Sequence, residues 1–158
     1  LEDPCMGELA TLIEDSFDIL DATLNKDTDK VAETIQSFHD SNVSILKYND
    51  ENSLACVVTL AYYSARDNYS IYREPQAGKG RADMIFVPLD KSKNLPIIVE
   101  LKKGKSPDEA LEQIKSRNYD EFFKDYQGEV ILVGVNYDED SKEGFKKHSC
   151  KIERIIRK

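Results

Sequence analysis

Cysteine and histidine are scarce in this chain of 158 residues, which contains three cysteines and two histidines. Cys5, Cys56 and Cys150 are odd in number, far apart and outside any CxxC pair, so we expect free thiols in a reducing compartment. The two histidines, His39 and His148, stand alone along the chain. The sequence therefore predicts neither a zinc site nor a Ser-His or Cys-His catalytic triad.

Long apolar segments are also missing. The longest stretch that is apolar and free of charge, Ser53 to Ala65, is too short to span a bilayer, which takes about 20 residues. The acidic first four residues have neither the basic region nor the apolar region of a secretory signal. We therefore expect a cytoplasmic protein with no membrane partner. These four residues are either a cloning remnant, with Met6 as the start, or part of the natural chain.

Basic residues are outnumbered, because 22 Lys and Arg stand against 30 Asp and Glu, for a net charge of −8. This balance at first argues against a nucleic-acid partner, since binding phosphates usually needs a basic surface. The charge is uneven, however. Residues 1–50 carry 12 acidic and 3 basic side chains, whereas residues 51–158 carry 18 acidic and 19 basic ones. The acidic excess belongs to the N-terminal third, where we interpret it as solvated helix faces. The nearly neutral remainder does not exclude nucleic acid.

The N-terminal third has the apolar spacing of two helices. The first is predicted over residues 9–24. The second is expected to have Thr28 as its N-cap and to bury Val31, Ile35 and Phe38. Together they predict an acidic helical appendage over residues 1–48.

The remaining residues, 49–158, alternate between helical and strand-like patterns. A helix that is apolar on nearly every side is expected over residues 51–65. A second helix begins with Ser106 as N-cap, Pro107 at the first position and Glu109 completing a capping box, and it runs to about Tyr126. Strands are predicted over residues 69–74, 82–88, 95–102, 130–135 and 148–156. This order of elements predicts one mixed α/β domain.

Charged side chains stand where a buried strand ends. Glu100 and Lys102 close the apolar run 97–99, and residues two apart on a strand share a face. Asp83 opens the preceding strand and would approach Glu100 if the two strands pair as a hairpin. Two carboxylates side by side suit a hard divalent cation such as Mg²⁺, and a neighbouring lysine could steer water or neutralise a phosphate. The alternative is an ordinary surface ion pair.

A resemblance to a known family covers the chain from about residue 51 to its end. Arg81 and Asp83, then Glu100 and Lys102, then Gln113 and Tyr119, resemble the motifs of the PD-(D/E)XK nuclease superfamily. More narrowly, the chain looks like the branch found C-terminal to bacterial AAA-ATPase-like domains. The resemblance implies a restriction-endonuclease-like α-β-β-β-α-β core with a mixed central sheet flanked by helices.

The resemblance also implies roles for individual residues. Asp83 and Glu100 would ligate Mg²⁺ or Mn²⁺, and Lys102 would orient or activate water. Glu51 would bind a second ion or its water, unless it is simply favoured by a helix N-terminus. Gln113 would steady Lys102 or a phosphate, unless it is a plain exposed residue.

Further positions match the motif around the hairpin and the helix that follows. Glu74 and Gly80 match the strand-turn motif of the branch in a supporting role, where Ala82 stands in place of the usual proline. Tyr119 is as compatible with the core as with the site. Basic residues near these positions could form one rim for contacts with the nucleic-acid backbone, although each alone is compatible with a solvated surface residue; they are Lys79, Arg81, Lys103, Lys105, Lys115 and Arg117.

Two functions remain open from the sequence. The first is a Mg²⁺- or Mn²⁺-dependent deoxyribonuclease that hydrolyses phosphodiester bonds, with DNA as partner, a fused or associated ATPase-like domain, and a homodimer as a further expectation. The second is a non-catalytic module that keeps the nuclease fold for protein or nucleic-acid contact within a larger protein. The charges at a buried strand end favour the first, because a structural role does not need them.

Overall fold

The computed structural model describes residues 4–42, 58–73, 84–116, 126–138 and 148–157, with side chains described from residue 14 to residue 38 in the first range. Its α-helices are α1 (Pro4–Leu24), α2 (Thr28–Asn42) and α4 (Pro107–Ser116), and η1 (Tyr63–Asp67) is a 3-10 helix. Its strands are β1 (Tyr69–Arg73), β2 (Met84–Pro88), β3 (Ile97–Lys103), β4 (Gly128–Tyr137) and β5 (His148–Arg157). Within these ranges no helix is both long and apolar enough to cross a bilayer.

The predicted strands are confirmed within the described residues, whereas one predicted helix differs. Residue 74 of the first predicted strand and residues 82–83 of the second lie outside the described ranges. Residues 58–61 are helical, but the chain then tightens into η1 instead of continuing as an α-helix to residue 65. Leu60 is 41% exposed, so this segment is not apolar and buried on every side. Residues 51–57 of that predicted helix, and residues 117–125 after α4, lie outside the described ranges.

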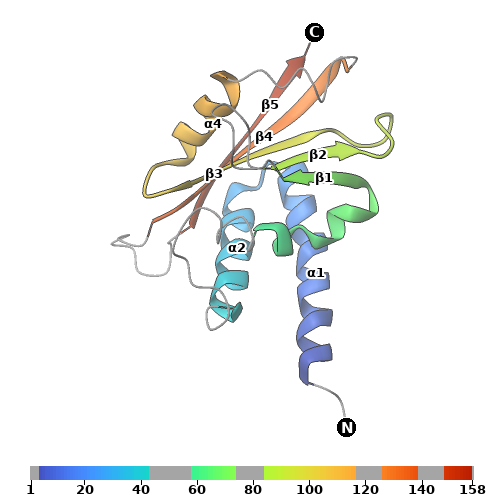
Figure 1. Cartoon of the computed structure of the whole chain (residues 1–158), viewed down its shortest axis with the longest axis vertical. Helices are drawn as coiled ribbons and strands as arrows, with labels where there is room; N and C mark the ends of the chain where they lie inside the picture. Colours follow the sequence, from blue (N-terminus) through green and yellow to red (C-terminus); the bar gives the residue numbers. More distant parts are fainter. Residues whose placement is uncertain (1–3, 43–57, 74–83, 117–125, 139–147, 158) are drawn as a thin grey trace.

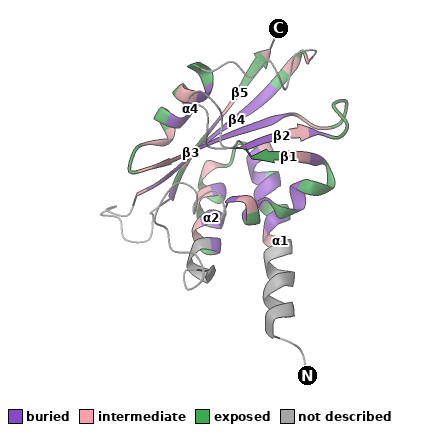
Figure 2. Cartoon of the chain, in the orientation of Figure 1, coloured by how far each residue is buried: buried purple, intermediate pink, exposed green. Residues whose placement is uncertain are grey.

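The five strands form one mixed sheet in the order β1-β2-β3-β4-β5. Only the β3–β4 pair is parallel, while the other three neighbouring pairs are antiparallel. A parallel pair needs a crossover connection, and the connection that contains α4 joins these two strands. Figure 1 shows α4 on one side of the sheet and α1 with α2 on the other. The result is an α/β architecture in which β3 and β4 are covered on both faces and are therefore buried along their centres (Figure 2).

Each face of the sheet has its own hydrophobic cluster. The larger cluster lies under α1 and α2 and includes Val99 and Leu101 of β3. The smaller one lies under α4 and includes Ile98 of the same strand together with Leu111 and Ile114 of α4. Alternate residues of β3 thus enter opposite clusters, as the two-residue period of a strand requires.

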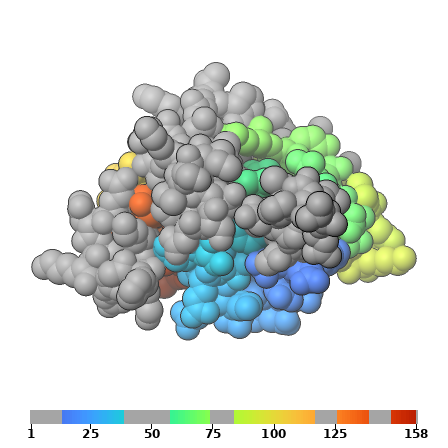
Figure 3. Space-filling view, turned by 90° about the horizontal axis from the view of Figure 1, so that it is seen from below, coloured from blue at the N-terminus to red at the C-terminus, as the bar shows by residue number. Residues whose placement is uncertain are grey.

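Buried polar contacts join α1 to the segment before β1. The Ser64 hydroxyl donates to the Ser16 carbonyl at 2.7 Å, and the Ser64 N–H donates to the Ser16 hydroxyl at 3.1 Å. The hydroxyls of Thr23 and Tyr62 lie 2.6 Å apart, and burial raises the pKa of Tyr62. Burying these polar groups without partners would cost free energy, so the contacts favour one position and orientation of α1 against residues 58–64. In Figure 3, α1 and α2 lie side by side next to residues 58–73.

The turn between α1 and α2 corrects the predicted helix cap. Asp27, not Thr28, is the N-cap of α2, because its Oδ1 accepts the Lys30 N–H at 3.2 Å. At the other side of the turn, Arg154 of β5 donates to the Leu24 carbonyl at the end of α1. A cation at a helix C-terminus complements the helix dipole. Both helices share a hydrophobic cluster with the sheet, and the division into an appendage and a domain after residue 48 stays a prediction.

Candidate active site

Glu100 and Lys102 are the charged residues of β3 that point toward the α4 face. Ile98, two residues before Glu100, belongs to the cluster under α4, whereas Val99 and Leu101 belong to the opposite cluster. The predicted shared face of Glu100 and Lys102 is therefore confirmed by the burial of their neighbours. The pair lies at the end of β3 from which the chain leaves toward α4.

The two side chains form a largely buried ion pair. Lys102 Nζ lies 3.7 Å from Glu100 Oε1, beyond hydrogen-bond distance, and their side chains are 14% and 4% exposed. Burying two charges costs free energy that a pair at this distance only partly returns. The arrangement is therefore unlike an ordinary exposed ion pair and is typical of a site that keeps charge in place for a ligand.

Glycine at position 134 lets α4 approach the sheet beside Glu100. Gly134 of β4 is the register partner of Glu100. A Cβ atom on Gly134 would lie 2.5 Å from the Pro107 carbonyl oxygen and 3.1 Å from the Ala110 Cβ. The first turn of α4 thus packs directly on the strand next to Glu100.

The turn between β3 and α4 is held by β4. The Gly104 N–H donates to the Tyr137 carbonyl at 2.8 Å, and Gly104 has a φ of +65°, which glycine adopts without strain. The Lys105 N–H donates to Asn136 Oδ1 at 3.0 Å, and Asn136 is 3% exposed. Sequence analysis missed this role of Asn136. The available signal was a single amide after the apolar run 130–135.

The start of α4 follows the prediction in part. The Ser106 hydroxyl accepts the Glu109 N–H at 3.1 Å, which confirms Ser106 as the N-cap. Among the hydrogen bonds of the described residues, none returns from the Glu109 side chain to the Ser106 N–H. The cap is therefore a single bond, and the reciprocal capping box is wrong.

Gln113 is half-buried on the flank of α4 that faces away from β5. Ion pairs mark the other flank, where Asp108 meets Lys151 and Lys115 meets Glu153. With 3.6 residues per turn, Gln113 lies across the buried stripe from those residues. This flank is turned toward β3, which carries Glu100 and Lys102, and is compatible with the predicted supporting role.

The predicted basic rim is not one continuous surface among the described lysines. Lys103 follows Lys102 directly in β3, so its side chain is directed toward the opposite face. Lys115 is engaged at 2.6 Å with Glu153 and at 3.8 Å with Glu112, and these carboxylates raise the pKa of its ammonium. Lys105 is exposed beside the site and remains available for a phosphate.

Several predicted site residues lie outside the described ranges; they are Glu51, Glu74, Lys79, Gly80, Arg81, Asp83, Arg117 and Tyr119. Their roles stay predictions. The strand register is nevertheless consistent with the prediction for Asp83. Met84, the next residue in the chain, pairs with Val99, the residue before Glu100. In the described ranges, no three side chains of His, Cys, Asp or Glu gather as a metal site would require.

The comparison with family models decides which family this fold and site belong to. Residues 49–147, more than half of the chain, match the model of the PD-(D/E)XK nuclease superfamily. The chain belongs to the PD-(D/E)XK nuclease superfamily. No curated protein matches the chain significantly.

The family match confirms the resemblance inferred from the motifs, and with it the restriction-endonuclease-like core. In this PD-(D/E)XK protein the elements of that core occur along the chain in the order β1, β2, β3, α4 and β4. The helical residues 58–61 precede them. The matched segment contains β3 with Glu100 and Lys102, and α4 with Gln113. Members of this superfamily are generally nucleases that use divalent metal ions, so the family directs attention to this end of the sheet.

Proposed function

We propose that this PD-(D/E)XK protein is a metal-dependent nuclease that hydrolyses phosphodiester bonds of DNA. The observation that carries the proposal is the buried Glu100–Lys102 pair, held beside the first turn of α4. A carboxylate and an ammonium kept in one enclosed place, at a cost in stability, are the groups that phosphodiester hydrolysis needs.

The donors present fit a hard divalent cation such as Mg²⁺ or Mn²⁺. Carboxylate oxygens are the protein ligands these ions prefer, and Mg²⁺ binds through only one or two of them. Glu100 would supply one carboxylate ligand. Asp83 is the proposed second ligand, because it precedes Met84, which pairs with Val99 next to Glu100. Glu51 is proposed for a second ion or its water. A bound ion lowers the pKa of a coordinated water and offsets charge on the phosphoryl oxygens.

Lys102 is the residue proposed to act on the attacking water. Its Nζ lies 3.7 Å from Glu100 Oε1, which is beyond hydrogen-bond distance. The ammonium is therefore held near the carboxylate without donating a hydrogen bond to that oxygen. From this position the ammonium would orient a water by donating a hydrogen bond to its oxygen, or would donate to a non-bridging phosphate oxygen. Gln113, on the flank of α4 turned toward β3, is proposed to position the lysine or the phosphate.

Contacts with the DNA backbone are proposed for Lys105, and for Lys79, Arg81, Arg117 and Tyr119 outside the described ranges. Lys103 is proposed only as a more distant contact, because it faces the opposite side of the sheet. A nearly neutral catalytic part predicts modest DNA affinity that falls with salt. A cytoplasmic setting in bacteria, an ATPase-like partner and a homodimer belong to the same proposal.

A cleavage assay tests the proposal. The chain is incubated with supercoiled plasmid, linear duplex, single-stranded DNA and RNA, in Mg²⁺, in Mn²⁺ and in a chelator. We expect metal-dependent cleavage of DNA that Lys102→Ala and Glu100→Gln each reduce at least about a hundredfold, since each removes a group acting in the transition state. Lys103→Ala is the matched control, because it removes a lysine from the next position of the same strand but from the other face. As a distant backbone contact Lys103 contributes at most to DNA affinity, so its variant should lose far less cleavage than Lys102→Ala at saturating DNA.

The outcomes separate the nuclease from the non-catalytic module. Cleavage by the chain that persists in the chelator would contradict the metal dependence, and cleavage that persists in Lys102→Ala would contradict the proposed role of Lys102. If no nucleic acid is cut and calorimetry detects no Mn²⁺ binding that depends on Glu100, the chain is the non-catalytic module. RNA cleavage with no DNA cleavage would keep the chemistry and correct the substrate.

A further inference from the structure

Asn136 lies beside Lys102 on the face of the sheet that α4 covers. The two residues are register partners in the parallel pair of β3 and β4, and the backbones of paired strands lie about 5 Å apart. Gly134, two residues earlier in β4, packs against the first turn of α4, and residues two apart on a strand share a face. The side chains of Asn136 and Lys102 therefore start from neighbouring points on the same face.

Only one end of the Asn136 side chain has a hydrogen-bond partner. Its Oδ1 accepts the Lys105 N–H at 3.0 Å. Because an N–H can donate only to the oxygen of an amide, this bond fixes which end of the side chain faces the turn before α4. Among the residues that the structure describes, no acceptor is hydrogen-bonded to Asn136 Nδ2.

This amide nitrogen is buried together with the rest of the side chain. Asn136 is 3% exposed, and nearly all buried polar groups in proteins have a partner. A buried donor without an acceptor costs free energy, which an apolar side chain such as those of residues 130–133 in the same strand avoids. The cost indicates that the acceptor for Asn136 arrives with a ligand.

The groups around Asn136 indicate the oxygens of an anion. Lys102 beside it carries an ammonium, which only donates, and the exposed Lys105 at the turn carries a second one. The carboxylate of Glu100 belongs to a position opposite Gly134, one step back along β3, and no hydrogen bond joins it to Asn136 in the described structure. Several donors on one part of a sheet suit a phosphate, which offers several acceptor oxygens.

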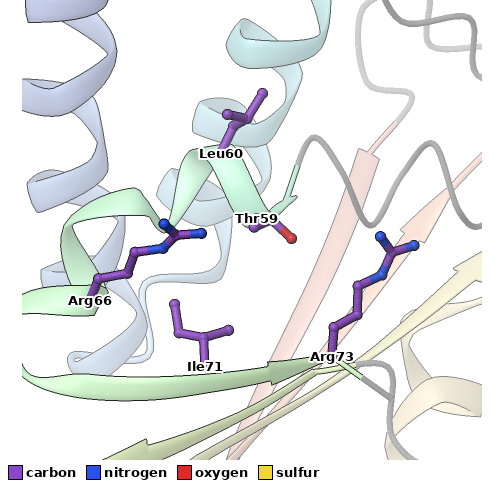
Figure 4. Close-up of a pocket in the computed structure, with 5 residues that line it drawn as sticks. All are labelled: Thr59, Leu60, Arg66, Ile71 and Arg73. Atoms are coloured by element: carbon purple, nitrogen blue, oxygen red, sulfur yellow. The ribbon is translucent and has the colours of Figure 1, made fainter. Parts of the chain in front are cut away.

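A hollow on the other face of the sheet differs from this place, because polar groups that line it already have contacts. Its lining residues are Thr59, Leu60, Arg66, Ile71 and Arg73. The Thr59 hydroxyl donates to Met84 Sδ at 3.9 Å, and Arg73 has contacts of its own. The Leu60 side chain points away from the space in Figure 4. We therefore assign no ligand to this hollow.

We propose that Asn136 Nδ2 donates a hydrogen bond to a non-bridging phosphate oxygen of the nucleic-acid substrate, beside the oxygen that Lys102 contacts. The proposal rests on the proposed nuclease function and adds a neutral donor to its site. The bond from the Lys105 N–H holds the amide in place, so the donor is oriented before the substrate arrives. The amide contributes this donor without placing a second positive charge next to Lys102.

Two substitutions of Asn136 separate donation to the substrate from support of the turn. Asn136→Asp keeps an oxygen that can accept the Lys105 N–H and loses both amide donors, whereas Asn136→Leu loses the acceptor and the donors without adding charge. We expect each variant to lower kcat/KM for DNA cleavage at least about tenfold, because each removes a hydrogen bond to a charged group.

A sulfur substitution in the substrate tests the contact itself. In phosphorothioate DNA, sulfur replaces one non-bridging oxygen of each phosphate, which keeps the charge but weakens hydrogen-bond acceptance. For each protein, kcat/KM on oxygen DNA is divided by kcat/KM on sulfur DNA of each configuration, in the same metal. This ratio does not depend on the fraction of folded protein, and the effect of sulfur on the metal cancels between variants. In one configuration we expect the ratio of the parent to exceed that of both Asn136 variants at least about threefold.

Ser149→Ala is the matched control, because the exposed Ser149 pairs with Asn136 from β5, on the side away from Lys102. Its ratio should equal that of the parent. Equal ratios in the parent and both Asn136 variants would overturn the contact, even if the variants cleave slowly, and would assign Asn136 to the turn alone. Absence of all cleavage by the parent would instead overturn the proposed nuclease function, and the contact with it.

Discussion

Lys102 Nζ lies 3.7 Å from Glu100 Oε1 at the end of β3, and both side chains are almost enclosed on the face that α4 covers. Sequence spacing accounts for their common face, and the sheet accounts for their burial. Strand β4 contributes to this site, because it has a glycine beside Glu100 and anchors the turn that leads into α4.

The first prediction concerns the free-energy coupling between these two residues. Lys102→Met leaves a buried carboxylate without this cation and should lower the free energy of unfolding by about 1–3 kcal/mol, less than for a fully buried pair because Lys102 is partly exposed. In a Glu100→Gln background the same change should cost at least about 1 kcal/mol less. Urea unfolding of the parent, both single variants and the double variant measures this cycle. Effects that add within about 0.5 kcal/mol would show that the pair does not interact.

The second prediction concerns the close approach of α4 to β4. Gly134→Ala places a Cβ against the Pro107 carbonyl oxygen and should lower the free energy of unfolding by about 2–3 kcal/mol, because backbone must move. It should also reduce DNA cleavage by displacing α4 from the site.

Gly104→Ala is the control for this substitution. Position 104 is open in space but has a φ of +65°, so alanine there should cost only about 1 kcal/mol in backbone strain. Urea midpoints and slopes for both variants give the comparison. Equal destabilisation of the two variants would mean that α4 does not pack on Gly134 as described.

The third prediction concerns alkaline stability. Burial raises the pKa of the Cys150 thiol from an ordinary value of 9.0 to about 12. The unfolded chain then loses this proton at lower pH than the folded chain does. The contribution of Cys150 is fully present below pH 9 and is lost as the pH rises from 9 toward 12, at no more than about 1.4 kcal/mol per pH unit.

Chemical unfolding at pH 8, 9 and 10 with Cys150→Ser measures this effect. The difference in unfolding free energy between parent and variant should shrink over this interval, and Cys5 and Cys56, present in both proteins, cancel. Tyr69, whose pKa burial raises to about 12 from 10.0, contributes mainly above pH 10 and also cancels. A difference that stays constant from pH 8 to pH 10 would contradict the raised pKa of Cys150.

Local patterns were sufficient for much of the core and for the centre of the candidate site. The five strands, the Ser106 cap and the common face of Glu100 and Lys102 all follow from residue spacing and from the chemistry of single residues. These features depend on neighbours in the chain, so the sequence carries them directly. The cap at Asp27 was missed because Asp27 and Thr28 are both good caps, and only the helix start separates them.

The sequence by itself determined the family, the order of elements and the acidic-lysine motif at the end of β3. Tertiary structure alone decided which lysines of the predicted basic rim share the face of Lys102 and which are engaged in ion pairs. It directs Lys103 away from Lys102 and pairs Lys115 with Glu153. The physical reason is that ion pairing, burial and pocket shape depend on contacts between residues far apart in the chain, which sheet order and helix packing set and residue spacing does not record.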